Sequence, residues 1–166
     1  ACNDPFRGAK QEMYEGGIRV PCCVRWPGQI SAGQVSDQIA MLMDFFPTFC
    51  EAAKVAIEHE IEARSILPLL LGHALDFSDR NYYWVRREGG AWGERQYLGH
   101  AYHAVRHGDL KLLCNDAFSP AELYNVSDDP RESEDLSETN DPGMQNLRAV
   151  LQRQVHAAGA VPWRKR

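Results

Sequence analysis

The sequence lacks three features that would point to large classes of protein. It has no apolar run of about 18 residues, so we expect no membrane-spanning helix. It has no excess of basic residues: 18 Lys and Arg against 23 Asp and Glu give a net charge of −5, which argues against a nucleic-acid-binding protein. It also has no Cys-x-x-Cys pair. An odd number of five cysteines fits neither a zinc ribbon nor a closed disulfide framework, so we expect buried free thiols.

What is present suits a globular protein. Hydrophobic residues make up 44% of the chain and aromatic residues 10%, a composition that is typical of proteins with a real core. The length of 166 residues fits one domain, or one domain plus part of another.

The first half of the chain contains one strand pattern and two helix patterns. Residues 18–25 alternate between apolar and polar side chains, which predicts an edge strand because the proline within them lacks a backbone N–H. Residues 45–53 follow Asp44 and carry a proline in the first turn, which predicts a helix, and residues 65–71 predict a shorter one. Such elements do not bury their apolar faces alone, so we interpret residues 1–75 as the remnant of a larger α/β domain. The exposed strand edge favours self-association.

The second half, residues 82–166, predicts a small antiparallel sheet covered by one C-terminal helix, an α+β arrangement. The expected strands are residues 82–86, 101–106, 110–114 and 122–126. Asp141 and Pro142 begin the expected helix, whose apolar stripe consists of Met144, Leu147, Leu151, Val155 and Ala158. Seven acidic residues between positions 127 and 141 indicate a solvated loop before the helix.

Few residues suggest chemistry by their spacing alone. His59 and Glu60 begin like a zinc-protease His-Glu-x-x-His motif, but Ala63 stands where the second ligand belongs. His100 and His103 project to opposite faces of a strand, so we expect no metal site there. Lys10 lies in a glycine-containing loop before the expected strand, where a lysine can offer a fixed cation to an anionic group.

A series of short segments resembles the C-terminal half of the formylglycine-dependent (type I) sulfatases. In chain order the segments are RGAK, YEGGIRVP, VRWPG, MDFFPTFCEAA, RSILPLLLG, AVRHGDLKLL and ELYNVSDDPRE, and they cover nearly the whole chain. The resemblance implies an alkaline-phosphatase-like α/β fold with a smaller C-terminal subdomain, in which a four-stranded antiparallel sheet packs on a long helix. It also implies hydrolysis of a sulfate ester, either an aryl sulfate or a sulfated carbohydrate.

The resemblance also implies roles for particular residues. Lys10 matches the lysine that contacts a sulfate oxygen in this family, and we interpret Glu15, Gly16, Gly17 and Arg19 as holding its loop against the sheet. The family's nucleophile is a formylglycine made from the cysteine of a Cys-x-Pro-x-Arg motif, and no cysteine of this sequence begins that pattern. The family's Ca²⁺ ligands precede the lysine segment. We therefore expect a partner, the N-terminal sulfatase domain, to supply both groups, and we expect this chain to be inactive alone.

The segment from Trp84 to His103 is a candidate for substrate binding beyond the sulfate group. We expect His103, Tyr102 and Glu88 to contact the substrate, because the family's C-terminal subdomain lies beside the mouth of the active site.

Two alternatives remain open at this point. One is a related phosphoester or phosphonate hydrolase, which would differ in its nucleophile. The other is a noncatalytic carbohydrate-binding module built on aromatic residues, namely Trp84, Trp92, Tyr97 and Tyr102.

Overall fold

The computed structural model describes residues 3–10, 12–86, 103–114 and 120–159. The chain divides into two compact units. One comprises Ala1–Val20 with Arg80–Arg166, and the other comprises Pro21–Asp79. Each unit has its own elements and its own contacts, so the two are treated in turn.

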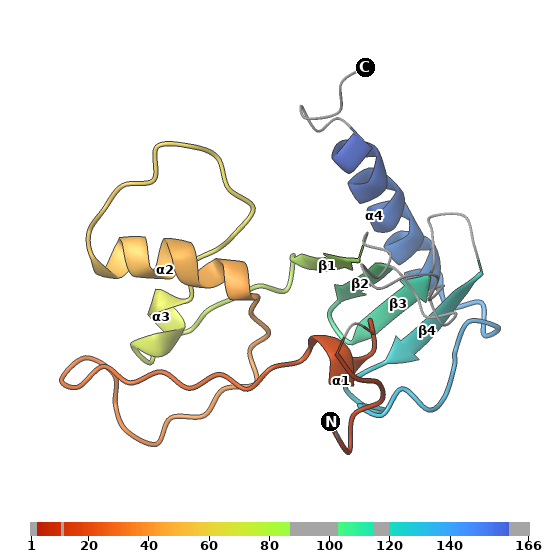
Figure 1. Ribbon diagram of the computed structural model, residues 1–166, viewed down its shortest axis with the longest axis horizontal. Helices are drawn as coiled ribbons and strands as arrows, with labels where there is room; N and C mark the ends of the chain where they lie inside the picture. Colours follow the sequence, from red (N-terminus) through yellow and green to blue (C-terminus); the bar gives the residue numbers. More distant parts are fainter. Residues whose placement is uncertain (1–2, 11, 87–102, 115–119, 160–166) are drawn as a thin grey trace, which may run out of the picture. The chain divides into compact units, whose positions relative to one another are not determined.

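The first unit contains a four-stranded antiparallel sheet in the order β1-β2-β3-β4 (Figure 1). The strands are β1 (Asn81–Val85), β2 (His103–His107), β3 (Leu110–Cys114) and β4 (Ala121–Asn125). Gly108 has a φ of 56° in the turn between β2 and β3, a backbone angle that glycine adopts without strain. All four strands were predicted from the sequence, within two residues at each end.

Helix α4 (Pro142–Gly159) covers one face of this sheet (Figure 1). Its N-terminus begins as predicted, because the Asp141 carboxylate accepts a 2.7 Å hydrogen bond from the backbone N–H of Gly143. The core between helix and sheet consists of Val105, Leu112, Cys114, Ala121, Leu123, Leu147, Val150 and Leu151. These strand residues occur at alternate positions, as expected for one face of a sheet.

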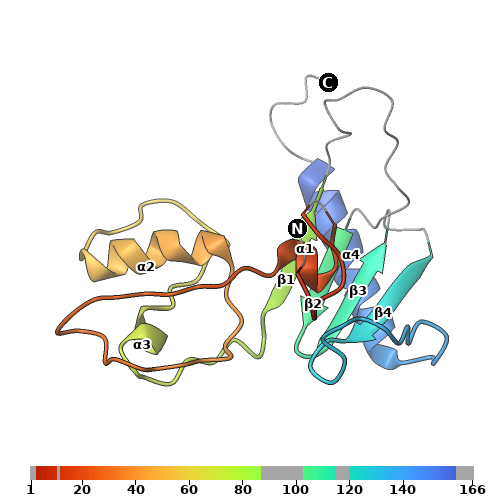
Figure 2. The same cartoon turned by 60° about the horizontal axis from the view of Figure 1, so that its bottom comes forward.

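The N-terminal segment covers the opposite face of the sheet. Helix α1 (Glu15–Ile18) and the residues before it pack there, in a second cluster that contains Met13, Tyr14, Ala104, Leu113, Tyr124 and Val126 (Figure 2). The sheet is therefore buried on both faces, which explains why β3 is apolar at Leu112 and at Leu113, both of which are fully buried.

The second unit contains three short helices, η1 (Leu42–Asp44), α2 (Phe45–Ala52) and α3 (Leu67–Leu70). Helix α2 was predicted, but the expected capping of its N-terminus by Asp44 is wrong, since that carboxylate makes no capping hydrogen bond to α2. The buried carboxylate instead accepts hydrogen bonds from the backbone N–H groups of Met41 (2.7 Å) and Arg64 (3.0 Å). It therefore ties η1 to the segment that leads into α3.

The strand predicted over residues 18–25 is absent. Ile18 ends helix α1, and residues 19–26 lie in neither a helix nor a strand. The backbone N–H groups of Ile18 and Arg19 donate to the carbonyl oxygens of Tyr14 and Glu15, so a helical turn uses donors that a strand would have given to a neighbour. We expected self-association through the edge of this strand, and residues 18–25 do not form the strand on which that expectation depended.

The two compact units also divide the chain at other residues than expected. Residues 1–20 pack with the sheet, whereas we expected them with the rest of residues 1–75. The assignment of residues 1–75 to a larger α/β domain stays a prediction.

Two further observations concern exposure and hydropathy. Among the four cysteines that the structure describes, the expectation of a buried thiol is confirmed for Cys114 and is wrong for Cys22 and Cys23, which are exposed, while Cys50 is partly exposed. Cys2 lies outside the described residues. In the part of the chain that the structure describes, no helix is both long enough and apolar enough to cross a membrane.

Candidate functional site

Lys10 lies exposed on a tight loop before α1. The loop closes on itself, because the backbone N–H of Glu12 donates to the carbonyl oxygen of Ala9 (3.0 Å) and the backbone N–H of Ala9 donates to the Glu12 carboxylate. Gly8 has a φ of 84°, which turns the chain into the loop. The Lys10 ammonium group makes no hydrogen bond or ion pair with the residues that the structure describes, so its charge is available to a ligand.

Two glycines at the start of α1 allow the helix to lie directly against this loop. The backbone N–H of Gly16 donates to the carbonyl oxygen of Arg7 at 2.7 Å. A Cβ atom added at Gly16 would lie 2.5 Å from the carbonyl oxygen of Gly8, and one added at Gly17 would lie 2.6 Å from that of Ala9. Any larger residue would therefore displace the backbone on the N-terminal side of Lys10.

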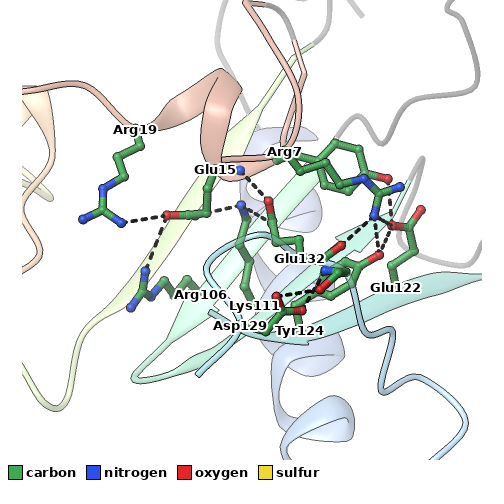
Figure 3. A network of polar contacts seen from close by, with 11 residues as sticks. Arg7, Glu15, Arg19, Arg106, Lys111, Glu122, Tyr124, Asp129 and Glu132 are labelled. Carbon is green, nitrogen blue, oxygen red and sulfur yellow. Dashed lines mark hydrogen bonds and ion pairs between the residues drawn. The ribbon is translucent and has the colours of Figure 1, made fainter. Parts of the chain in front are cut away.

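A buried lysine and two glutamates hold α1 on the sheet (Figure 3). Lys111 projects from β3, and its ammonium group donates to the carboxylates of Glu15 (2.8 Å) and Glu132 (2.7 Å). The other oxygen of Glu132 accepts the backbone N–H of Glu15 at 2.6 Å. We call Lys111, Glu15 and Glu132 the buried triad. Its side chains are at most 7% exposed, so the ionic contacts operate with little screening by water.

The charge of the buried triad is balanced by two arginines nearby. Arg106 and Arg19 place their guanidinium groups 3.9 Å and 4.0 Å from the second carboxylate oxygen of Glu15. Burial raises the pKa of the Glu132 carboxyl above its ordinary value, and the positive charge of Lys111 counteracts this shift. Burial likewise lowers the pKa of Arg106, against the opposing effect of Glu15.

A second group of contacts holds the N-terminal end of the loop. Arg7 donates to the hydroxyl group of Tyr124 and to the carbonyl oxygen of Glu132, both at 2.9 Å, and its guanidinium group lies 4.0 Å from the centre of the Tyr14 ring (Figure 3). Both tyrosine hydroxyls donate to one carboxylate oxygen of Glu122, at 2.7 Å and 2.6 Å. Burial, followed by these bonds to Glu122, raises the pKa of both phenols well above their ordinary value.

The residues predicted for substrate binding lie elsewhere. His103 is half-buried on β2, where its Nδ1 lies 2.9 Å from the hydroxyl oxygen of Tyr83 and the two rings stack at 6.0 Å. Alternation along β2 places His103 on the face of Val105, which packs on α4, whereas the Lys10 loop belongs to the opposite face. The structure therefore does not bring His103 and Lys10 together. Tyr102 and Glu88 lie outside the described residues.

Sequence reasoning missed Lys111 and Glu132. A single lysine within the apolar run of β3 was a signal for a buried cation with a partner. Glu132 was counted among the acids of a solvated loop, and this expectation is wrong because its side chain is fully buried. No sequence signal distinguished Glu132 from the six exposed or partly exposed acids around it. The interpretation of Glu15, Gly16 and Gly17 as holding the loop against the sheet is confirmed. The fourth residue of that interpretation, Arg19, is largely exposed and forms only a 4.0 Å ion pair with Glu15 in support of it.

The described residues contain no group of three or more His, Cys, Asp or Glu side chains that could hold a metal ion. The chemistry that the arrangement supports is the presentation of one exposed cation, Lys10, from a loop that is fixed on both sides.

Comparison with known proteins gives one family and several similar chains. The family model described as "N-sulphoglucosamine sulphohydrolase, C-terminal" matches residues 8–160. The steryl-sulfatase of Mus musculus is 45% identical over 74 residues, which cover 43% of this chain and 12% of that protein. The N-acetylglucosamine-6-O-sulfatase of Bacteroides thetaiotaomicron is 31% identical over 132 residues, which cover 76% of this chain and 23% of that protein.

The fold is also similar to that of solved structures. The crystal structure of Ps i-CgsB in complex with k-i-k-neocarrahexaose has a TM-score of 0.77 and 24% identity, and the match covers 93% of this chain and 32% of that chain. This likeness confirms the expected fold, a four-stranded antiparallel sheet with a C-terminal helix. The chain spans less than a third of the length of each of these three proteins.

Proposed function

Since the chain belongs to the family of N-sulphoglucosamine sulphohydrolase C-terminal segments, as the resemblance predicted, we propose that it forms the C-terminal part of a sulfatase. The whole protein would hydrolyse sulfate esters. A sulfated carbohydrate is the favoured substrate class, because the matching family model and the relative that is 31% identical over 132 residues are both named for sulfated sugars. Steryl-sulfatases match up to 90% of this chain at 28% identity, so sterol sulfates are the second class.

The exposure of Lys10 is the observation that supports a role for this chain in the reaction. Lys10 is an exposed cation without a partner among the described residues, on a loop whose backbone is held by α1. Such a cation donates hydrogen bonds to a sulfate oxygen and stabilises the negative charge that develops on the sulfuryl oxygens as the ester bond breaks. Because the backbone of the loop is held before substrate binds, only the side chain of Lys10 has to be ordered during the reaction.

The family's formylglycine and Ca²⁺ ion have no match in the cysteine motifs of the sequence or among the side chains that the structure describes, respectively. None of its five cysteines begins a Cys-x-Pro-x-Arg motif, from which the family makes its formylglycine. In the described ranges, no cluster of acidic or histidine side chains fits the family's Ca²⁺ ion. We therefore assign to this chain the binding of the sulfate group, and we assign the nucleophile and the metal to an N-terminal sulfatase domain of the same protein.

The contacts beyond the sulfate group remain a proposal by resemblance. His103, Tyr102 and Glu88 would contact parts of a larger substrate beyond the sulfated unit, because His103 and the Lys10 loop lie on opposite faces of the sheet. His103 is half-buried at the start of β2, where its contact with the hydroxyl group of Tyr83 restricts the orientation of the imidazole ring.

The test uses the protein that contains this chain and an aryl sulfate as the substrate. We expect Lys10→Ala to lower kcat by about 100-fold, the usual cost of removing one donor that stabilises the transition state. Lys54→Ala is the matched control, because Lys54 is also an exposed lysine but belongs to the other compact unit. Equal activity of the Lys10→Ala and Lys54→Ala variants would contradict the role of Lys10. Hydrolysis of an aryl phosphate but not of an aryl sulfate would contradict the substrate class.

A further inference from the structure

We propose that the buried triad of Lys111, Glu15 and Glu132 is a positioning device for Lys10. This inference rests on the proposed function, in which Lys10 contacts the sulfate group. The triad touches no substrate; it fixes the loop that carries Lys10 by fixing the helix against which that loop packs.

The first step of the argument is that the triad holds α1 at two points of one residue. Glu132 accepts the backbone N–H of Glu15, and Lys111 binds the Glu15 carboxylate. Glu15 is the first residue of α1, so both the place and the direction of the helix start are set by these bonds. Lys111 and Glu132 are also bonded to each other, so their two bonds to Glu15 together fix the position and the orientation of this residue.

The second step is the contact between α1 and the loop. Gly16 and Gly17 follow Glu15 directly, and their Cα atoms lie so close to the carbonyl oxygens of Gly8 and Ala9 that no Cβ fits between them. A displacement of Glu15 is therefore transmitted through backbone contact to the residue before Lys10. The three atoms nearest to each added Cβ all belong to the backbone, which cannot absorb such a shift by a change of rotamer.

The third step is that buried charged groups occupy a position where apolar side chains would cost less free energy. Burying a lysine with two carboxylates costs desolvation energy, and well-packed apolar residues of similar volume often stabilise a fold as well or better. Met13 and Tyr14 already provide apolar packing for the end of the loop. What ionic hydrogen bonds add is direction, since each has a preferred distance and angle that apolar contacts lack.

Glu132→Gln is the most informative variant, because it keeps the size of the side chain. Each carboxylate oxygen of Glu132 accepts one donor, Lys111 on one side and the backbone N–H of Glu15 on the other. A glutamine has one acceptor oxygen, and its NH₂ group would face one of these donors. The variant therefore breaks one of the two bonds without creating a cavity.

The first experiment is a double-mutant cycle on kcat in the protein that contains this chain. If Glu132 acts through Lys10, Glu132→Gln lowers kcat by about 10-fold when Lys10 is present and by less than about 2-fold in the Lys10→Ala background. Asp135→Asn is the matched control, because this acid of the same loop binds the backbone N–H of Leu123 on β4 rather than α1. We expect Asp135→Asn to change kcat by the same factor in both backgrounds.

The second experiment follows the loop itself and needs no activity. Trypsin cleaves after lysine and arginine, so the rate of cleavage after Lys10 reports opening of the loop. Cleavage after Arg153, an exposed residue within α4, requires that helix to unfold and so reports unfolding of the same compact unit. We expect Glu132→Gln to raise the ratio of cleavage after Lys10 to cleavage after Arg153 by about 10-fold, which corresponds to the loss of one charge-assisted hydrogen bond.

The outcomes separate this inference from the proposed function. Equal factors in both backgrounds together with an unchanged cleavage ratio would overturn the positioning role and leave the triad as a support of the fold alone. Full activity of Lys10→Ala would overturn the role of Lys10 in the proposed function, while the cleavage ratio would still show whether the triad holds the loop. If Lys10→Ala has no measurable activity, the cleavage ratio decides alone: a raised ratio supports the inference and an unchanged one overturns it.

Discussion

Replacement of Lys111 by methionine tests the energetics of the buried triad directly. The Lys111 side chain is fully buried between the carboxylates of Glu15 and Glu132, at 2.8 Å and 2.7 Å. Methionine has a similar length and fills the same space, so the change removes a charge and leaves little cavity. It also leaves two buried carboxylates without their shared cation. Breaking a buried pair in this way costs about 3–5 kcal/mol, a large part of the total stability of a typical domain.

Urea unfolding followed by circular dichroism measures this cost. With a urea dependence of about 2 kcal/mol per molar, a loss of about 4 kcal/mol lowers the unfolding midpoint by about 2 M. Lys54→Met is the control, because Lys54 is exposed and its replacement should change the free energy of unfolding by less than about 0.5 kcal/mol.

A charge-balanced variant distinguishes a lost partner from a lost contact. If the cost of Lys111→Met arises from unpaired carboxylates, the triple change Lys111→Met, Glu15→Gln, Glu132→Gln should recover most of the lost stability, since neither buried carboxylate then remains. The recovery should be incomplete, because Arg106 loses its partner Glu15. A loss below about 1 kcal/mol for Lys111→Met alone would refute the reasoning. It would mean that Arg106 and Arg19, which lie 3.9 Å and 4.0 Å from Glu15, suffice to compensate the carboxylates.

Three further predictions concern the glycine contact, the tyrosines and the substrate. Gly17→Ala should lower the free energy of unfolding in urea by about 1–3 kcal/mol and should speed tryptic cleavage after Lys10, because the added Cβ would lie 2.6 Å from the carbonyl oxygen of Ala9. Unchanged stability and cleavage would contradict this close contact. Tyr14 and Tyr124 have pKa values above their ordinary value of 10, so above pH 10 the native state keeps protons that the unfolded state releases, and the free energy of unfolding should fall as the pH rises. Glu122→Gln should weaken this fall, and an unchanged pH profile in that variant would contradict the contribution of Glu122. His103→Ala in the whole protein should lower kcat/KM on a sulfated oligosaccharide and spare a small aryl sulfate, whereas an equal fall on both would place His103 in the fold or the sulfate site.

The sheet and its covering helix were determined by local sequence signals. Two short strand-like segments on either side of one glycine turn specify β2 and β3, and the pairing of these strands follows from the short connection between them. Asp141 and Pro142 start α4 by interactions within the first turn, and the apolar stripe of the helix specifies which face turns to the sheet. All of these signals act between residues that are close in sequence, so the sequence alone sufficed to predict them.

The sequence also predicted the loop that carries Lys10, because its segments resemble those of a known family. The position of Lys10 in a glycine-containing loop predicted an exposed cation, and the structure places it in that state. The resemblance also pointed to Glu15, Gly16 and Gly17 as residues that hold this loop, but it did not show that Lys111 and Glu132 anchor Glu15 to the sheet.

Tertiary structure alone decided the path of residues 15–25 and the partners of Lys111. The alternation of residues 18–25 favours a strand, yet a strand forms only where a neighbour offers backbone partners, and no described segment does so here. In the triad, Glu15 lies 96 positions before Lys111 in the sequence, and Glu132 lies 21 positions after it. A buried charge is stable only where the fold brings its partner within bonding distance. No local pattern could therefore show which of the many acids in the chain would be buried, because that choice was made by the packing of the N-terminal segment on the sheet.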